Sequence, residues 1–174
     1  MEEKEKEIIK ILKKGGIGVM PTDTLYGLVG STFSKEAVKR IYKLKQRDKN
    51  KKLIILISSV NDLKKFKINL TNVQSRILNK IWPGKVSVIL NNVAFRLPKN
   101  KKLIEILKKT GPLVGPSANP EGLKSAENIS QAKKYFGDKV DFYLAGGTLK
   151  GEPSALIKIS KNGEIKVLRG NIKL

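Results

Sequence analysis

Four segments of the chain carry more hydroxyl, amide, cationic and glycine residues than a plain connection needs. The first, PTDTLYGL, runs from Pro21 to Leu28 and follows an apolar stretch, 16–20, that predicts a short strand. Its hydroxyls and backbone N–H groups could hold a small polar ligand. A strand-to-helix turn capped by Asp23 or Thr24 is the alternative interpretation of the same residues.

The second segment, 43–58, is rich in cations. Lys45 and Arg47 lie two residues apart where a helix is expected to end, and three further lysines follow before a buried strand. Clustered cations suit a triphosphate or a carboxylate ligand. In a chain with so many lysines, a solvated charged loop remains the alternative.

The third segment, LVGPSANPEG, covers 113–122 and places a serine and an asparagine directly after a short apolar run. Hydroxyl, amide and free backbone N–H groups therefore gather where a strand ends, which is a common ligand position in α/β sheets. A proline-rich turn is the alternative.

The fourth segment consists of GEPSALIKI, 151–159, and VLRGN, 167–171. Arginine is scarce in the chain, so the position of each one is informative. Arg47, Arg96 and Arg169 lie in or beside these unusual segments or on a short predicted strand, whereas the other two arginines fall within predicted helices.

Missing side chains narrow the chemistry. The chain has no His and no Cys, which excludes Ser-His-Asp and Cys-His catalysis, disulfides and thiolate zinc sites. Any metal must be held by oxygen ligands, which suits Mg²⁺ on a phosphate substrate.

The net charge of +21 has two interpretations. It predicts binding to nucleic acid through counterion release, or it reflects a lysine-rich composition typical of AT-rich genomes, which we favour. Both interpretations imply a general attraction for anions.

The length of 174 residues and the 40% hydrophobic content predict one folded domain, 1–174. The charged N-terminus does not resemble a secretory signal, and no apolar run approaches a membrane span. We therefore expect a cytoplasmic protein that contacts no membrane.

Periodicity and cap residues predict the elements that must position these segments. Helices are expected at 3–14, 34–45, 60–66, 71–81, 100–109 and 126–136. Strands are expected at 16–20, 52–58, 85–90, 93–97, 112–115, 140–145, 154–159 and 164–168, with tight turns at Asn91-Asn92 and Asn162-Gly163. Interleaved helices, strands and hairpins indicate an α/β fold with a mixed sheet, and the glycines of 146–153 would allow that loop to act as a lid.

The order and spacing of the unusual segments resemble the YrdC family of threonylcarbamoyl-AMP synthases. Seven motifs occur in the family's order, and they span nearly the whole chain. They are Pro21–Leu28, Lys45–Arg47, Trp82–Gly84, Arg96–Pro98, Ser117–Asn119, Pro153–Ala155 and Arg169–Gly170.

The resemblance implies a YrdC-like twisted mixed β-sheet flanked by helices, with a large concave basic groove. It also implies synthesis of threonylcarbamoyl-AMP and pyrophosphate from L-threonine, bicarbonate and ATP with Mg²⁺. The product would pass to a downstream threonylcarbamoyl-transferase complex that modifies tRNA.

Residue roles follow only where residues match the family's motifs. The resemblance assigns catalysis to Lys45, Arg47, Ser117 and Asn119. It assigns ATP binding to Arg47, Lys51, Asn92, Ser117, Ser125 and Arg169, and L-threonine binding to Thr24, Arg96, Gly115 and Ser154. It assigns no metal ligand.

Among the departures from the family's pattern, three fall at single positions in or near the predicted site. Leu56 stands where the family commonly has His, which affects one threonine contact. Glu121 and Ala155 stand where the family has hydroxyl side chains. These departures could reflect altered substrate handling or sequence drift.

Two other functions remain open. One is a non-catalytic protein of this fold that binds double-stranded RNA or tRNA during RNA maturation, which the basic charge would permit. The other is formation of a carbamoyl-adenylate on another amine, as in the related domain of hydrogenase-maturation proteins. The matches at Lys45, Arg47, Ser117 and Asn119 favour the threonylcarbamoyl-AMP synthase.

Overall fold

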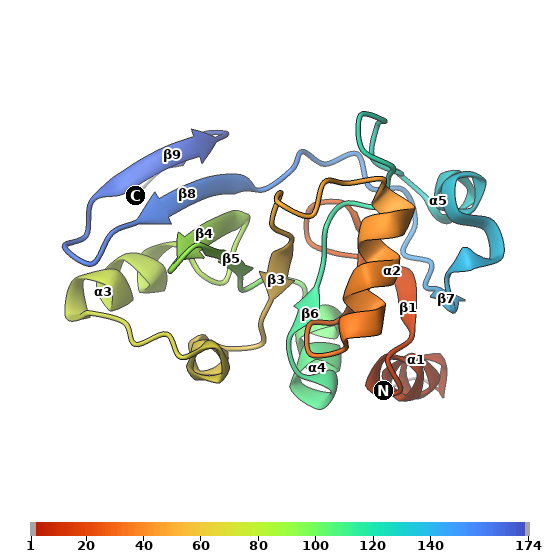
Figure 1. Cartoon of the computed structure of the whole chain (residues 1–174), viewed down its shortest axis with the longest axis horizontal. Helices are drawn as coiled ribbons and strands as arrows, with labels where there is room; N and C mark the ends of the chain where they lie inside the picture. Colours follow the sequence, from red (N-terminus) through yellow and green to blue (C-terminus); the bar gives the residue numbers. More distant parts are fainter. Residues whose placement is uncertain (1–2, 173–174) are drawn as a thin grey trace.

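Nine strands form one mixed sheet in the computed structural model, which describes residues 3–172 (Figure 1). The strand order is β7-β1-β2-β6-β3-β5-β4-β8-β9. The strands are β1 (Ile17–Pro21), β2 (Tyr26–Ser31), β3 (Ile54–Leu56), β4 (Val86–Leu90), β5 (Val93–Arg96), β6 (Leu113–Val114), β7 (Phe142–Tyr143), β8 (Ala155–Ile159) and β9 (Ile165–Arg169). The pairs β1/β7, β3/β5 and β4/β8 are parallel and the others antiparallel, which confirms the mixed α/β prediction.

The helices lie on both faces of this sheet. They are α1 (Glu3–Lys13), α2 (Lys35–Lys45), α3 (Asn72–Ile81), α4 (Lys101–Thr110) and α5 (Ile129–Phe136), with 3-10 turns η1 (Val60–Phe66) and η2 (Gly137–Lys139). Leu12 of α1 and Leu107 of α4 share a buried cluster with Met20. Ile41 of α2 belongs to a second cluster with Val19, to which α3 and α5 also contribute. Because adjacent residues of a strand point to opposite faces, β1 separates the two cores.

Side-chain caps fix where the helices begin. The hydroxyl of Ser34 accepts a hydrogen bond from the Ala37 N–H at 3.2 Å, which confirms the predicted start of α2. The helix expected from 126 begins only at Ile129, because Asn128 is its N-cap. No helix among residues 3–172 is long and apolar enough to cross a membrane.

The sequence interpretation missed β2. Residues 26–31 pair antiparallel with β1, so PTDTLYGL is a hairpin turn followed by a strand, and the strand-to-helix turn is wrong. Glycines obscured the strand pattern, although packing requires at least one of them. A Cβ at Gly30 would lie 2.9 Å from the Ile17 side chain and 3.1 Å from that of Ile41, so glycine lets α2 approach the sheet.

Both predicted tight turns are present. Asn91 and Asn92 connect β4 to β5 with φ angles of 47° and 63°, as a two-residue turn with two left-handed positions requires. Gly163, at φ 93°, supplies the left-handed position of the β8–β9 hairpin.

A crossing strap, residues 144–154, runs past the ends of the strands from β7, at one edge of the sheet, to β8, next to the other edge (Figure 1). Tyr26 fastens it: its hydroxyl accepts a hydrogen bond from Gly146 N at 2.8 Å and donates one to Gly147 O at 2.7 Å. A Cβ at Gly151 would lie 2.1 Å from the Thr24 carbonyl oxygen, so this glycine permits the strap to lie on the β1–β2 turn. Lid movement of 146–153 stays a prediction.

Candidate active site

One cavity collects most of the residues singled out from the sequence. It is bordered by the β1–β2 turn, the end of α2, the loop before β3, the segment after β6 and the end of the crossing strap. Eight of the twelve predicted site residues line it: Thr24, Lys45, Arg47, Arg96, Gly115, Ser117, Ser154 and Arg169. Lys51, Asn92, Asn119 and Ser125 do not line it, and the catalytic and binding roles of all twelve residues stay predictions.

The cavity lining is cationic. It includes Lys45, Arg47, Lys52, Arg96 and Arg169, and none of the described residues lining it is Asp or Glu. The cations oppose one another: Arg47 contributes to the lowered pKa of Arg169, which burial lowers most. Such a lining attracts an anion with several charges. The wider basic groove stays a prediction.

Arg96 is buried in the cavity lining, with a side chain only 6% exposed, and we call the lining around it the enclosed part of the cavity. Its Nη1 donates to the Thr24 hydroxyl at 2.9 Å, its Nη2 donates to the Asp23 carboxylate, and its Nε donates to the Gly84 carbonyl at 3.3 Å. Burial lowers the pKa of Arg96, and the Asp23 carboxylate opposes that shift. Asp23 also accepts a hydrogen bond from Lys99 N at 3.0 Å, so the guanidinium plane is fixed.

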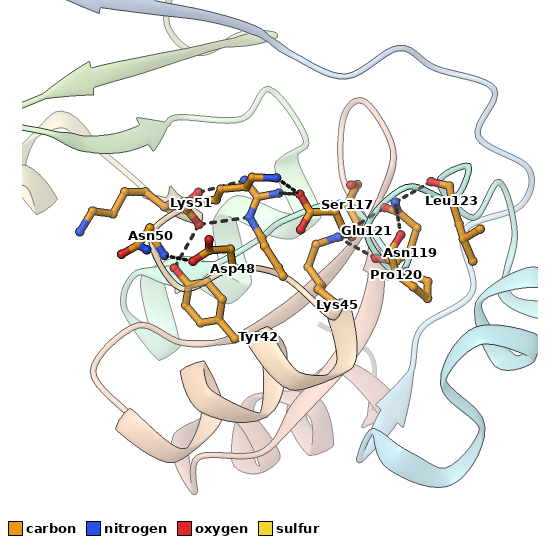
Figure 2. Close-up of polar contacts among 12 residues, drawn as sticks. Tyr42, Lys45, Asp48, Asn50, Lys51, Ser117, Asn119, Pro120, Glu121 and Leu123 are labelled. Atoms are coloured by element: carbon orange, nitrogen blue, oxygen red, sulfur yellow. Dashed lines mark hydrogen bonds and ion pairs between the residues drawn. The ribbon is translucent and has the colours of Figure 1, made fainter.

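Lys45 ends α2 and is 2% exposed. Its Nζ donates to the carbonyls of Ser117 and Asn119 at 2.6 and 2.8 Å, and lies 3.4 Å from the Asn119 side-chain oxygen (Figure 2). Burial, and then the charge of Arg47, lowers the pKa of Lys45 to about 8. The ammonium therefore holds the Ser117–Asn119 segment against the end of α2.

Asn119 shapes the loop that follows it. Its Nδ2 donates to the carbonyls of Pro120 and Leu123 at 2.9 and 2.7 Å. Its Oδ1 accepts from the Ser125 hydroxyl at 3.4 Å. Asn119 and Lys45 thus act on the loop geometry, whereas Ser117 lines the cavity.

Arg47 differs from Lys45 in its exposure and its partners. Its Nε and Nη2 donate to the carbonyls of Lys51 and Lys52 at 3.1 and 3.4 Å, and its side chain is 28% exposed. Its Nη1 lies 3.9 Å from Oε1 of Glu121, which also accepts from Lys51 Nζ at 2.6 Å. The hydrogen bond from Lys51 lowers the pKa of Glu121. This ion-pair network was not expected from the sequence.

The last part of the chain completes the cavity. Arg169 donates from Nε and Nη2 to the Ser154 carbonyl at 3.1 and 2.9 Å. The Ser154 hydroxyl lies 2.8 Å from that of Ser87, and both residues are buried. Sequence reasoning did not single out Ser87, which lies on a strand with no unusual motif.

Leu56, where the resemblance led us to expect a histidine, lies in the core. A Cβ at Gly115 would come within 2.4 Å of the Leu56 side chain, so this leucine packs directly beneath a cavity-lining glycine.

The fold and the cationic cavity define an α/β protein equipped to bind an anionic ligand. A family model described as "Telomere recombination", covering Sua5, YciO and YrdC, matches residues 10–170. The chain therefore belongs to the Sua5/YciO/YrdC family.

Relatives and solved structures agree with this assignment. A putative threonylcarbamoyl-AMP synthase of Methanocaldococcus jannaschii is 29% identical over 99% of this chain and 90% of its own length. A threonylcarbamoyl-AMP synthase of Marinobacter nauticus is 33% identical over 83% of this chain and 85% of its own length. P. abyssi Sua5 complexed with L-threonine superposes with a TM-score of 0.87 at 25% identity over 95% of this chain and 53% of that one. E. coli YciO superposes with a TM-score of 0.87 at 22% identity over 97% of this chain and 89% of that one, which supports the fold.

Proposed function

We propose that the chain is a threonylcarbamoyl-AMP synthase that converts L-threonine, bicarbonate and ATP into threonylcarbamoyl-AMP and pyrophosphate. The observation that carries the proposal is one cavity lined by Lys45, Arg47, Lys52, Arg96 and Arg169. The names of the relatives and the L-threonine complex of P. abyssi Sua5 support the choice of substrates.

The proposed reaction requires no nucleophile from the protein. The threonine amine adds to CO₂ derived from bicarbonate and loses a proton, which gives a carbamate. A carbamate oxygen then attacks the α-phosphorus of ATP, and the bond to the β-phosphate bridging oxygen breaks to release pyrophosphate. The protein supplies alignment and positive charge, which are the main contributions to phosphoryl transfer.

We assign the enclosed part of the cavity to threonine. Arg96 has the planar fork that suits a carboxylate, and the hydroxyls of Thr24 and Ser154 lie on the same lining, beside the backbone of Gly115. Thr24, Asp23 and Gly84 already accept hydrogen bonds from Nη1, Nη2 and Nε of Arg96, so the substrate carboxylate would meet the second N–H of Nη1 and of Nη2 in a fixed orientation.

We assign the more open part to the nucleotide. This part lies around Arg47, whose side chain is 28% exposed, and Lys51 lies beside Arg47 through Glu121. Ser117 and Arg169 are further lining residues that we assign to the nucleotide. Asn92 and Ser125 stay proposed contacts of lower structural support. Lys45 and Asn119 would act by holding the Ser117–Asn119 segment in place.

The residues present suit a metal that arrives with the substrate. Within residues 3–172, no group of three or more His, Cys, Asp or Glu side chains could hold a metal ion. We propose that Mg²⁺ binds the phosphates of ATP, where it would neutralise charge on the departing pyrophosphate.

The product would serve a tRNA-modifying threonylcarbamoyl transferase, and the site of action would be the cytoplasm. Direct binding of tRNA or double-stranded RNA remains the alternative suggested by the charge of +21.

The test is an assay of pyrophosphate release with ATP, Mg²⁺, bicarbonate and one amino acid at a time. We expect release with threonine that disappears when bicarbonate is removed. Pyrophosphate release with another amine in place of threonine would show that the amine substrate is not threonine. No release with any amine, together with RNA binding that weakens steeply with salt, would favour the RNA-binding alternative.

A further inference from the structure

Glu121 provides an internal anion beside Arg47, a lining residue of the cavity, although Glu121 itself is not part of the lining. Its Oε1 lies 2.6 Å from Lys51 Nζ and 3.9 Å from Arg47 Nη1, and its backbone N–H donates to the Lys45 carbonyl at 2.7 Å. The carboxylate thus connects two loops that are far apart in the sequence: the cationic loop after α2 and the loop after β6 (Figure 2).

The position of Arg47 makes this contact relevant to ligand binding. Two of its guanidinium nitrogens, Nε and Nη2, donate to the carbonyls of Lys51 and Lys52, while Nη1 faces Glu121. Nη1 is therefore the part of the fork least used by the protein's own backbone. A phosphate that approaches Nη1 and Lys51 must compete with a carboxylate already there.

We propose that Glu121 occupies the position of a ligand phosphate at Arg47 and Lys51 in the free protein and is displaced when a polyphosphate binds. The inference rests on the proposed function in that it assigns the open part of the cavity to phosphates. It makes Glu121 a residue that weakens binding and selects for ligands with several negative charges.

The energetics suit an exchange. The side chains of Glu121 and Lys51 are 30% and 58% exposed, so water and salt screen their attraction, and an exposed ion pair contributes little stability. A pyrophosphate carries more charge and more acceptor oxygens than a carboxylate, and can replace it at both cations. A displaced Glu121 would in turn repel the bound pyrophosphate and speed its release.

The experiment measures the affinity of inorganic pyrophosphate for the full chain by titration calorimetry, without metal and again with Mg²⁺. We expect Glu121→Gln and Glu121→Ser to bind pyrophosphate about three- to fivefold more tightly than the parent chain, which corresponds to the upper part of the range for losing one exposed competing ion pair. Inhibition by pyrophosphate should strengthen by a similar factor.

Glu127→Gln is the matched control. Glu127 forms an ion pair with Lys124 at the same 2.6 Å, and its removal changes the net charge equally, but its partner is Lys124, whereas Glu121 pairs with Arg47 and Lys51. We expect its pyrophosphate affinity to change less than twofold. An equal gain in Glu127→Gln would show a general charge effect and overturn the proposal.

Other outcomes also decide. Unchanged or weaker pyrophosphate binding in both Glu121 variants overturns the proposal. Weaker binding that occurs only with Mg²⁺ also overturns it, because it would mean that Glu121 contacts the metal rather than competes with the phosphate. Failure of both variants to fold, seen by circular dichroism, would show a structural role and overturn it as well. Tighter pyrophosphate binding without threonine-dependent turnover would overturn the proposed function alone, whereas no binding by any variant would overturn both.

Discussion

The regions around Arg96 and Arg47 each pair an arginine with a carboxylate, but the first pair is buried and the second is partly exposed. Each places an arginine on the cavity beside a carboxylate from a distant segment, Asp23 or Glu121. The side chains of Arg96 and Asp23 are 6% and 9% exposed, whereas those of Arg47 and Glu121 are 28% and 30% exposed. Burial makes the first pair a fixed part of the fold, and exposure leaves the second pair free to exchange partners.

This difference matches the two proposed ligands. A small amino acid needs a preformed slot, because few contacts must hold it in one orientation. A nucleotide brings several charges of its own and can displace a weakly held carboxylate. The cavity therefore combines a rigid part around Arg96 with a part around Arg47 in which a ligand can replace the carboxylate of Glu121.

The largest expected effect comes from removing the buried arginine. Arg96→Met leaves the buried Asp23 carboxylate without its cationic partner, so we expect the free energy of unfolding to fall by about 3–5 kcal/mol. Urea unfolding measures the change. The double variant Asp23→Asn/Arg96→Met should recover part of the loss, and a fall below about 1 kcal/mol in the single variant would contradict a fixed, buried pair.

The exposed arginine should separate activity from stability. Arg47→Met removes a cation from the open part of the cavity, and we expect threonine-dependent turnover to fall at least about 100-fold. Its bonds join it mainly to its own loop, so the free energy of unfolding should change by less than about 1 kcal/mol. Near-normal turnover, or a stability loss as large as in Arg96→Met, would remove the distinction between the two regions.

Lys45, two residues before Arg47, should make the stability of the protein depend on pH. Its pKa is lowered to about 8 in the fold, chiefly by burial, against about 10.5 for an unfolded chain. Between these values the unfolded chain holds more protons, so the stability of the protein should rise with pH from about 8 to about 10.5. We expect a rise of about 1–3 kcal/mol relative to Lys45→Met, measured by urea unfolding at pH 7 and pH 10. Parallel pH profiles for the two proteins would contradict the shift.

The smallest effect concerns the crossing strap. Tyr26→Phe removes the hydroxyl that binds Gly146 and Gly147, and we expect a loss of about 1 kcal/mol with faster amide exchange at Gly146. Tyr135→Phe is the control, because its hydroxyl binds the Lys124 carbonyl away from the cavity. Unchanged exchange at Gly146 would show that backbone packing alone holds the strap.

Local signals in the sequence predicted the helices well. Ser34 and Asn100 accept backbone hydrogen bonds at the first turns of α2 and α4, and such caps act within a few residues. Strand β2 escaped prediction because its glycines break the apolar alternation, and tertiary packing explains at least Gly30. The order of the sequence motifs was enough to identify most of the candidate residues that the structure places on one cavity.

The pairs that distinguish the two parts of the cavity were not predictable. Asp23, in the β1–β2 turn, meets Arg96 of β5, although β6 and β3 lie between β2 and β5 in the sheet. Glu121, after β6, meets Lys51 and Arg47, which precede the neighbouring strand β3. Asp23 was considered only as a cap, and Glu121 only as a departure from a motif. No local pattern encodes such pairs, because the strand order of the sheet decides which loops face each other.

The sheet order also dictates when a growing chain can acquire its binding cavity. Thr24 emerges from the ribosome early, but Ser154 and Arg169 follow only after nearly every other element has been made. Strand β7 must pair beside β1, and β8 beside β4, before the crossing strap can span the sheet. Such non-local pairing is slow, so nascent chains should spend most of their synthesis unable to capture a nucleotide and gain that ability in one late step.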